Sequence, residues 1–376
     1  MRDDASRDFQ ELAARFARDR LTPFAAQWER AKTIPSGLLR DMGELGFFGI
    51  LAPEEYGGAQ SSFLSFIVAL EQIAGGNGAV STLMHVHSLG TMGPILKLGT
   101  AEQKRTWISR MVSGEAIGAV CLTEPGAGSD VAGISTRAVR DGNGWRLNGT
   151  KQFITNGARA SVAIILAVTD PAAGARGMTF FLVPAGTPGY KAGPPEEKMG
   201  QRVSDTTQIF LEECWVPDDA ILGGLNEAFR QTMGLLSDGR ISIAAQAVGM
   251  AQAAFDHALA YAKERRAFGK AIIENQAVAF RLADMAMKID VARTYTYAAA
   301  RRLDEGLDCV KEASMAKLFA AEMAERVCSD ALQIHGGYGY LQDYPLERLC
   351  RDVRVCQIYE GTNDIQRLII ARRISA

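Results

Sequence analysis

The segment Glu360-Gly361-Thr362-Asn363 carries the residue whose type and position best suit acid–base chemistry. It separates two helical patterns, so the Glu360 carboxylate is expected on a loop just ahead of a helix N-terminus. Gly361 beside it allows a ligand or another backbone to approach closely. A carboxylate placed like this can act as a general base when a bound apolar substrate excludes water and raises its pKa. Taken alone, the loop equally suits a solvated Glu beside a turn Gly.

Four further stretches combine polar side chains with glycine or aromatic residues. Residues 121–130 (CLTEPGAGSD) follow a β-rich run and expose backbone N–H groups that suit ring edges or phosphates, although an ordinary Pro-Gly turn has the same composition. Residues 151–156 (KQFITN) end a strand pattern, and such a segment is often part of a core. Residues 265–269 (RRAFG) join two helical patterns, where an exposed basic helix end is the alternative. Residues 333–339 (QIHGGYG) end a helix, as a plain C-cap also would.

Several common site motifs are missing from the sequence. Gly126 and Gly128 begin a GxGxxG pattern, but Val131 takes the third glycine position and no helical pattern follows. His85 and His87 lie two residues apart, which on a helix points them to different faces. Because there is no HExxH motif or Cys/His cluster, we expect no metal site. The GxSxG signal of serine hydrolases is also absent.

Hydrophobic and turn patterns divide the chain into three parts. Residues 1–116 predict a helical domain, residues 117–225 a β domain and residues 226–376 a helical bundle. The middle part contains short β-rich runs separated by turns with no helices between them, which is typical of an antiparallel barrel or sandwich. These runs are Ile117–Thr123, Trp145–Leu147, Lys151–Ile154, Val162–Val168, Met178–Val183 and Thr207–Leu211. The predicted class is therefore a multidomain α+β protein.

The last part should be an antiparallel four-helix bundle. Apolar periodicity predicts helices over 226–263, 275–305 and 310–334, joined by short connections. A final helix should follow the Glu360 loop, capped by Thr362 or Asn363. Its buried face is expected at Ile365, Leu368, Ile369, Ile370 and Ala371.

Composition excludes several classes of partner. The 376 residues are 47% hydrophobic and 22% charged, with a formal net charge of −2 and a pI near 6.2, so neither nucleic acid nor an anionic membrane is an expected partner. No run approaches the ~18 apolar residues of a membrane span. The early acidic residues argue against a signal or transit peptide. Six cysteines without a CxxC pair predict reduced thiols and a cytoplasmic location.

Taken together and in this order, six blocks resemble the acyl-CoA dehydrogenase family over nearly the whole sequence, and most closely its short-chain and isobutyryl-type members. The blocks are CLTEPGAGSD, NGTKQFITN, GQRVSDT, ERRAFG, QIHGGYG and YEGTNDIQR. The resemblance implies an FAD enzyme that converts a short- to medium-chain acyl-CoA, straight or branched, to the trans-2-enoyl-CoA. It further implies that Glu360 removes the α-proton, that the β-hydrogen leaves as hydride to flavin N5, and that electrons pass to an electron-transfer flavoprotein. A homotetramer built as a dimer of dimers is the family's usual form.

The resemblance also implies the residues that contact cofactor and substrate. Expected FAD contacts within one subunit are Val120, Cys121, Leu122, Thr123, Gly128, Ser129, Phe153, Ile154 and Thr155. Expected contacts with the FAD of a neighbouring subunit are Arg265, Gln276, Gln333, Ile334, Gly336 and Gly337. Phe268 is also expected to bind the cofactor, and Thr362, Asn363 and Asp364 are expected on its adenine side. Ser129, Ser237, Asp238, Arg240, Tyr359 and Gly361 are expected along the acyl-CoA.

The sequence departs from the family pattern at two positions. Some members carry the base just before the arginine that corresponds to Arg240, but here that residue is Gly239, which leaves Glu360 as the candidate. Ala271 stands where family members usually have a Pro in the flavin-facing loop, and the effect of this difference on the loop stays open. An acyl-CoA oxidase that passes electrons to oxygen and a catalytically silent flavin-binding homologue are the alternative functions.

Overall fold

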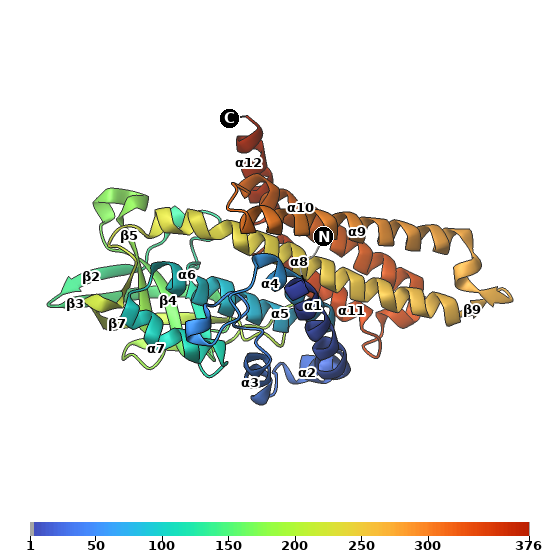
Figure 1. The fold of residues 1–376 in the computed structure, drawn as a ribbon, viewed down its shortest axis with the longest axis horizontal. Helices are drawn as coiled ribbons and strands as arrows, with labels where there is room; N and C mark the ends of the chain where they lie inside the picture. Colours follow the sequence, from blue (N-terminus) through green and yellow to red (C-terminus); the bar gives the residue numbers. More distant parts are fainter. Residues whose placement is uncertain (1–3, 376) are drawn as a thin grey trace.

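The structure, a computed structural model, describes residues 4–375 and, within them, all side chains except those of residues 233–236. Its long axis runs from a β-sheet at one end to the tips of long helices at the other (Figure 1). The chain order is helices, then strands, then helices, as the turn and periodicity patterns predict. Strand β1 begins at Gly118 and helix α8 at Ala228. These breaks lie near the predicted limits, and we keep the three-domain division as a proposal.

Three long helices form the C-terminal bundle, and all lie within a few residues of their predicted positions. They are α8 (Ala228–Glu264), α9 (Gln276–Asp304) and α10 (Val310–His335). The break between α8 and α9 is a small hairpin of β9 (Arg266–Ala267) and β10 (Lys270–Ala271), which lies at the far end of the molecule from the sheet (Figure 1). Two shorter helices, α11 (Leu346–Val353) and α12 (Asn363–Ile374), pack against α10.

Most of the N-terminal helices share one hydrophobic core with this bundle, whereas the last two pack in a second cluster with the sheet. The N-terminal helices are α1 (Asp4–Phe16), α2 (Ala25–Ala31), α3 (Gly37–Glu44), α4 (Phe63–Gly76), α5 (Gly78–His85), α6 (Gly93–Leu98) and α7 (Ala101–Val112), with the π-helical segment η4 (Val86–Met92) between α5 and α6. Phe66 of α4, Val248 of α8 and Ala320 of α10 are all completely buried in this core. Helix α4 approaches α8 closely at Gly249, where an added Cβ would lie 2.1 Å from the Glu71 carbonyl oxygen. Glycine is therefore required at this contact.

The middle part is an eight-stranded sheet with the order β6-β7-β3-β2-β4-β5-β8, with β1 also paired to β4. Its strands are β1 (Gly118–Cys121), β2 (Arg137–Asp141), β3 (Gly144–Ile154), β4 (Val162–Val168), β5 (Met178–Pro184), β6 (Tyr190–Pro195), β7 (Thr207–Pro217) and β8 (Ile221–Leu222). The pairing is mostly antiparallel, as expected, but β1 runs parallel to β4 over its whole length. The sequence patterns did not predict β2, β6 or β8.

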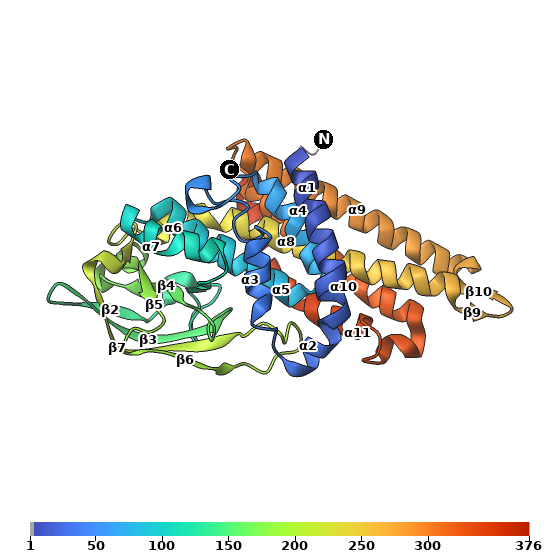
Figure 2. The same ribbon diagram turned by 60° about the horizontal axis from the view of Figure 1, so that its bottom comes forward.

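Helices cover one face of the sheet. Along β4, Ile164 packs in a cluster with Ile108 and Met111 of α7, whereas the next residue, Ile165, packs in a second cluster with Trp145. Figure 2 shows α6 and α7 lying over the strands on this side. The strand period of two therefore gives β4 two buried faces, which explains its continuous apolar run.

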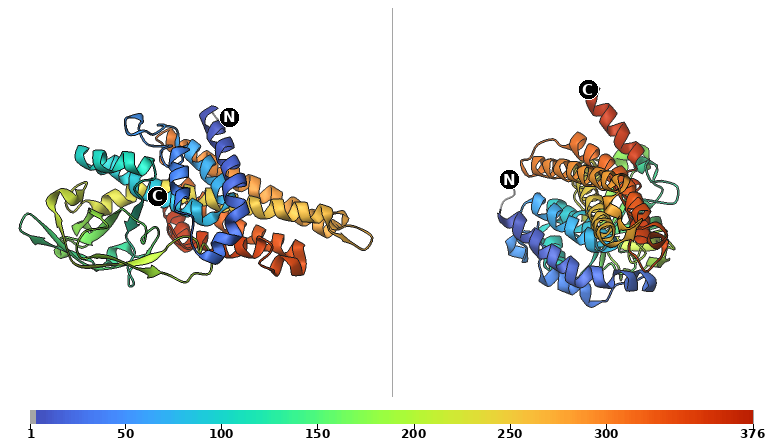
Figure 3. Two further views of the ribbon diagram at one scale, coloured as in Figure 1. Left: turned by 90° about the horizontal axis from the view of Figure 1, so that it is seen from below. Right: turned by 90° about the vertical axis from the view of Figure 1, so that its right-hand side faces the viewer.

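The last helix corrects one prediction. Thr362 caps α12 by accepting a hydrogen bond from the Ile365 N–H, as expected. The predicted apolar face is not buried, however: Leu368 is 45% exposed, and the buried residues of α12 are Asn363 and Gln366. The reason is that α12 contacts the bundle on the side of α10 and otherwise projects out of it, which leaves the rest of its surface exposed (Figure 1 and Figure 3). Among the residues that the structure describes, no helix is both long and apolar enough to cross a lipid bilayer.

Candidate active site

Glu360 lies on the loop that precedes α12, with its side chain 27% exposed. Its backbone is in the left-handed region at φ 55°, and Gly361 follows at φ 85°. A non-glycine residue rarely adopts this conformation, and strained positions of this kind are concentrated at functional sites. The turn directs the carboxylate inward, and the Glu360 N–H makes no hydrogen bond to any described residue.

The carboxylate is held by a histidine from a distant part of the chain. His85, the last residue of α5, is 3% exposed, and its Nε2 lies 3.1 Å from Glu360 Oε1. Its Nδ1 lies 2.7 Å from the Oγ of Ser242 on α8. The neighbouring His87 faces elsewhere: its Nδ1 accepts a hydrogen bond from the Gly118 N–H, and its Nε2 lies 2.9 Å from the Met111 carbonyl. The expectation that the two rings point to different faces is confirmed.

Helix α8 makes room for the base by having no side chain at Gly239. A Cβ built at Gly239 would lie 2.6 Å from Glu360 Oε2 and 3.0 Å from its Cδ. The Glu360 carboxylate therefore lies in the space that a side chain at position 239 would use. One oxygen of this carboxylate, Oε1, is hydrogen-bonded to His85, and the other, Oε2, lies beside α8 at Gly239.

Cations surround the base. The buried Arg240 on α8 and Lys317 on α10 both act on the Glu360 charge. Burial favours a higher pKa for Glu360, but the hydrogen bond from His85 and the charges of Arg240 and Lys317 hold that pKa below its ordinary value. Burial itself lowers the pKa of Lys317 to about 8. Glu360 is therefore an ionised carboxylate near neutral pH, as a proton acceptor must be.

Lys317 also fixes the loop that carries the base. Its ammonium donates to the Gly361 carbonyl at 2.8 Å and to Asn363 Oδ1 at 2.9 Å. On the other side of the loop, the Gln366 amide donates to the Glu360 and Gly361 carbonyls. Tyr359 is anchored by its hydroxyl, which donates to Gln246 Oε1 at 2.7 Å. These bonds satisfy the loop's carbonyls and keep the strained turn in place.

The two stretches expected at the flavin lie side by side at the end of the sheet. The completely buried Lys151 forms an ion pair with Glu124 at 2.8 Å and donates to the Leu122 carbonyl. The Gln152 N–H donates to the Thr123 carbonyl at 2.8 Å, which ties β3 to the 121–130 loop. The pairing of β3 with β7 shifts register between Lys151 and Ile154. Phe153 lies in this irregular stretch, with φ 59° and 64% of the residue exposed.

This edge of the sheet is attached to the helix that carries His85. Asn156, just after β3, donates to the carbonyls of Leu83 on α5 and Gly118 on β1. Val120 of β1 approaches Gly90 of η4, where an added Cβ would lie 3.3 Å from it. The 121–130 loop, Phe153 and the Glu360 loop are thus held by elements that pack directly on one another.

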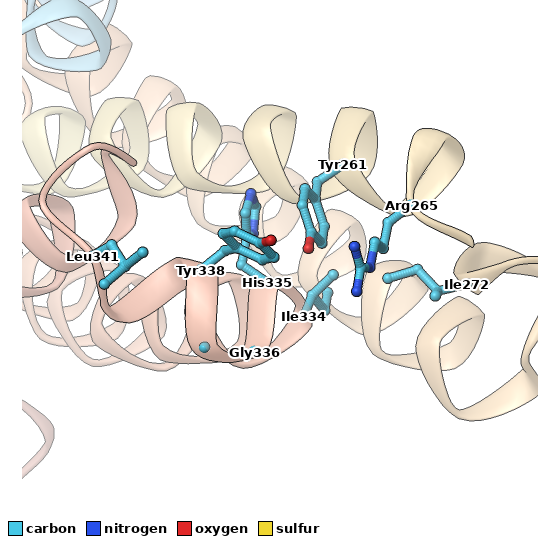
Figure 4. Close-up of a pocket in the computed structure, with 9 residues that line it drawn as sticks. Tyr261, Arg265, Ile272, Ile334, His335, Gly336, Tyr338 and Leu341 are labelled. Carbon is cyan, nitrogen blue, oxygen red and sulfur yellow. The ribbon is translucent and has the colours of Figure 1, made fainter. Parts of the chain in front are cut away.

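A third group of predicted residues lines a cavity of about 450 Å³ at the far end of the bundle (Figure 4). Its wall includes Arg265, Ile334, Gly336 and Gly337, which the family resemblance led us to expect at a neighbouring subunit's cofactor. The Arg265 guanidinium lies 5.7 Å over the ring of Tyr338, and Tyr261 stacks on His335 at 4.2 Å. Nothing lies within 4 Å of a Cβ added at Gly336 or Gly337, so the backbone there is open to a ligand.

The predicted contacts therefore fall into separate places within one chain. The group from Val120 to Thr155 lies at the sheet, whereas the group from Arg265 to Gly337 lies at the opposite end of the long axis (Figure 1). Thr362 and Asn363 start α12 close to the base, and Asp364 is exposed. Ser237 and Arg240 are buried on α8, and Asp238 is paired with Lys97 at 3.1 Å. Phe268, in the β9–β10 hairpin, is 96% exposed.

The residues present fit FAD and an acyl-CoA. The exposed ring of Phe153 beside a glycine loop with open space at Gly126 suits a flat ring system. The Nε of the buried Arg240 has no hydrogen-bond partner among the described residues, as expected of a donor that serves a polar ligand. Sequence reasoning missed His85, Ser242, Lys317 and Gln246 as parts of this site. Nothing in their local patterns marks them, because each looks like an ordinary residue of a buried helix.

Comparison with family models covers nearly the entire chain. Residues 3–115 match the acyl-CoA dehydrogenase N-terminal domain, residues 119–214 the middle domain and residues 226–375 the C-terminal domain. The chain is 44% identical over 363 residues to an acyl-CoA dehydrogenase of Bacillus subtilis, covering 96% of each chain. It is 44% identical over 356 residues to the mitochondrial short-chain specific acyl-CoA dehydrogenase of Homo sapiens, covering 95% of this chain and 86% of the relative. It is 43% identical over 367 residues to the 3-(aryl)acrylate reductase of Clostridium sporogenes, covering 97% of each chain.

Comparison with solved structures supports the same family assignment. The butyryl-CoA dehydrogenase of Megasphaera elsdenii has a TM-score of 0.98 at 37% identity, covering 100% of this chain and 99% of that one. A chain in the structure of the electron transferring flavoprotein of Acidaminococcus fermentans has a TM-score of 0.98 at 40% identity, covering 100% and 98%. A glutaryl-CoA dehydrogenase of Mycobacterium smegmatis in complex with FADH2 has a TM-score of 0.94 at 30% identity, covering 100% and 95%. The chain therefore belongs to the acyl-CoA dehydrogenase family and is an FAD-dependent oxidoreductase.

Proposed function

We propose that this enzyme removes one α- and one β-hydrogen from a short- to medium-chain acyl-CoA, straight or branched, with Glu360 as the base for the α-proton. The observation that carries the proposal is the placement of an ionised carboxylate on a strained, well-anchored loop. Its Oε1 is bonded to His85 while its Oε2 faces the side-chain-free position of α8. A fixed base with one unshared oxygen is suited to proton abstraction.

The site also supplies what a weakly acidic thioester requires. The Glu360 N–H, which has no partner among the described residues, is suited to donate a hydrogen bond to the thioester oxygen as negative charge develops there, as in an oxyanion hole. An apolar acyl chain that covers the carboxylate would remove water and raise the pKa of Glu360, so the base becomes stronger once substrate is bound. Bound FAD supplies the acceptor for the hydride that leaves the β-carbon. Phe153, Thr155 and the 121–130 loop are the proposed FAD contacts within the subunit.

Relatives support the substrate class and the acceptor. The human relative is named short-chain specific, and the Megasphaera elsdenii structure is a butyryl-CoA dehydrogenase. The structural match in the electron transferring flavoprotein study supports a flavoprotein as the electron acceptor. The six cysteines are all free thiols, which agrees with the proposed cytoplasmic location.

The test is anaerobic single-turnover reduction of the flavin by butyryl-CoA. Glu360→Gln retains the shape of the side chain but cannot accept a proton, so the rate should fall ~10²–10⁴-fold, the usual contribution of a positioned base. Glu11→Gln, at an exposed position of α1, is the control and should reduce at the parental rate. Flavin reduction by Glu360→Gln within a fewfold of the parent would mean that Glu360 is not the base.

A second measurement separates the dehydrogenase from the alternative oxidase. After reduction by substrate, the enzyme is exposed to air and the return of flavin absorbance is followed. Slow reoxidation in air together with fast reoxidation by an electron-transfer flavoprotein is expected. Fast turnover with oxygen alone would assign the oxidase activity instead.

A further inference from the structure

Three side chains from three elements form one hydrogen-bonded chain behind the base. Ser242 lies on α8, His85 ends α5, and Glu360 precedes α12. Ser242 Oγ lies 2.7 Å from His85 Nδ1 and also 2.7 Å from the carbonyl oxygen of Gly239. A hydroxyl has a single proton, so Ser242 can donate to one of these two acceptors at a time.

The protonation state of His85 decides which acceptor Ser242 uses. A neutral imidazole has one N–H, and the ionised Glu360 carboxylate requires that hydrogen on Nε2. Nδ1 then carries a lone pair and accepts the Ser242 proton. A cationic imidazole has hydrogens on both nitrogens, so Nδ1 donates to Ser242 Oγ and the hydroxyl turns to the Gly239 carbonyl. Both states satisfy every polar group without moving a heavy atom.

His87 shows that this arrangement is not general for a buried ring here. Its Nδ1 accepts from the backbone N–H of Gly118, so its Nε2 must donate to the Met111 carbonyl. Both partners are backbone groups that cannot exchange roles. Burial lowers the pKa of His87 to about 4, so this ring stays neutral. His85, in contrast, has a hydroxyl partner that can reverse its role.

We propose that His85 is a positioning residue that holds Glu360 Oε1 in both of its own protonation states, with Ser242 turning between His85 Nδ1 and the Gly239 carbonyl to accommodate the proton. The inference rests on the proposed role of Glu360 as the base. Its consequence is that Glu360 Oε1 keeps a hydrogen-bond donor, and the carboxylate stays aimed at the substrate, in either protonation state of His85.

The other charges that face Glu360 do not produce this behaviour. Arg240 on α8 is a permanent cation, and Lys317 on α10 has a pKa near 8, so both stay protonated throughout the acid range. Their positive charges near Glu360 therefore do not change as the pH falls below 7. A change in the acid limb of activity therefore reports on the Ser242–His85 pair.

The experiment follows the proton step apart from the redox step. Acetyl-CoA has α-hydrogens but no β-carbon, so in D₂O the holoenzyme can exchange its α-hydrogens without reducing flavin. Deuterium incorporation is measured by mass spectrometry as a function of pD, and flavin reduction by butyryl-CoA as a function of pH. Four variants are compared with the parent: His85→Gln, Ser242→Ala, His87→Gln and Glu360→Gln.

His85→Gln preserves a donor to Glu360 but removes the ring that can carry a positive charge, so the acid limb of both profiles should move up by about one pH unit, the lower end of the effect of a cation near a carboxylate. Ser242→Ala, which changes only the partner of Nδ1, should move it in the same direction with FAD content unchanged. His87→Gln should leave the limb at its parental position.

The outcomes distinguish the two proposals. If Glu360→Gln abolishes exchange but both His85→Gln and Ser242→Ala retain the parental acid limb, the inference about His85 is overturned and the proposed function stands. If Glu360→Gln still exchanges at the parental rate, both are wrong. A limb that moves in His87→Gln as much as in His85→Gln would assign the effect to general packing and also overturn the inference.

Discussion

At the scale of single residues, the position of the base depends on a side chain that is missing. Gly239 lies inside α8, where glycine costs about 1 kcal/mol relative to alanine. The Glu360 carboxylate takes the space that a Cβ would need. Glycine therefore lowers the stability of α8 at this position, but it leaves space for the Glu360 carboxylate. Glycine is the one residue that allows both the helix and the carboxylate to occupy this place.

Gly239→Ala should therefore impair catalysis without harming the fold. The added Cβ would displace Oε2 from a 2.6 Å contact, and the flexible Glu360 side chain would swing away. A displacement of about 1 Å costs on the order of 10²-fold in rate, while the melting temperature should stay the same or rise. Stopped-flow flavin reduction and thermal unfolding measure the two effects. Parental kinetics in Gly239→Ala would contradict the described position of the carboxylate.

The same geometry predicts a transfer of the base between elements. Glu360→Gly alone should be inactive, because it removes the carboxylate. Adding Gly239→Glu places a carboxylate from α8 into the space that Glu360 vacates, so the double variant should recover part of the flavin-reduction rate. Gly239→Gln in the Glu360→Gly background is the control, because it fills the space without a base.

Sequence reasoning reached some of these residues and missed others for a physical reason. Glu360 stands in a recognisable loop, and Thr362 in a recognisable cap. His85 is 275 residues from Glu360 and sits in an apolar helix, where a histidine is usually an ordinary core residue. Its role depends on how α5 packs against α8 and the final loop, which no local pattern encodes.

At the scale of elements, the buried Glu124–Lys151 pair shapes the loop expected at the flavin. Glu124 also accepts from the N–H and Oγ of Ser135 and from the Thr136 N–H. Burial favours a higher pKa for Glu124, but these donors and Lys151 lower it to about 2. The pair and its donors lock the 121–130 loop onto β3, so one carboxylate organises both predicted flavin segments.

This pair should contribute to acid stability in a defined pH window. The folded pKa of Glu124 is about 2, below its ordinary value of 4.5, so its contribution is complete above about pH 4.5 and is lost as pH falls toward 2. Glu124→Gln leaves Lys151 buried without a counter-charge and should destabilise the protein by about 3–5 kcal/mol at pH 7. Urea unfolding at pH 7 and pH 3 measures the free energy of unfolding. The difference between the parent and Glu124→Gln should be smaller at pH 3.

A matched double variant separates charge from packing. Glu124→Leu with Lys151→Met removes both charges, so it should recover much of the stability that Glu124→Gln loses. Equal stability of the parent and Glu124→Gln at pH 7 would show that the pair does not hold the loop.

The strength of the local pattern decided which elements could be predicted. Helices α8, α9 and α10 have long apolar periodicity, and β4 and β5 are continuous apolar runs, so all five were located to within a few residues. Strand β6 (Tyr190–Pro195) is mostly exposed and contains two prolines at its end, and β2 is largely polar. Strand β6 lies at the edge of the sheet and β2 lies between β3 and β4, and both are defined by their hydrogen-bonding partners and not by their own composition.

At the scale of the whole molecule, the residues expected around one FAD are split between the two ends of the chain. The cavity is lined by residues at the ends of α8 and α10, and these helix ends lie at the opposite end of the molecule from β3, the strand that carries Phe153 (Figure 1). If both groups serve one cofactor, they must come from different copies of the chain. Exposed apolar residues on the bundle, including Phe280, Met287 and Val291 of α9, agree with a covered surface in an assembly.

We therefore predict a homotetramer, measured by sedimentation as four times the 40.6 kDa chain mass. Arg265→Glu reverses a charge at the proposed intersubunit cofactor contact and should lower FAD affinity while the chain stays folded. Arg230→Glu, a highly exposed position near the start of α8, is the control and should bind FAD normally. A monomer with full FAD content and full activity would contradict this prediction.

The core shared by α4, α8 and α10 has a consequence for how the chain is made. Helix α4 ends at Gly76, but its partner α8 ends at Glu264. At a synthesis rate of about 5–20 residues per second, the ribosome needs roughly 10–40 s to supply the second helix after the first. For that interval Phe66 and its neighbours lack the helix that buries them. Nascent chains stalled before α8 should thus be trapped by chaperones or cleaved by protease, and chains stalled beyond α10 should be resistant.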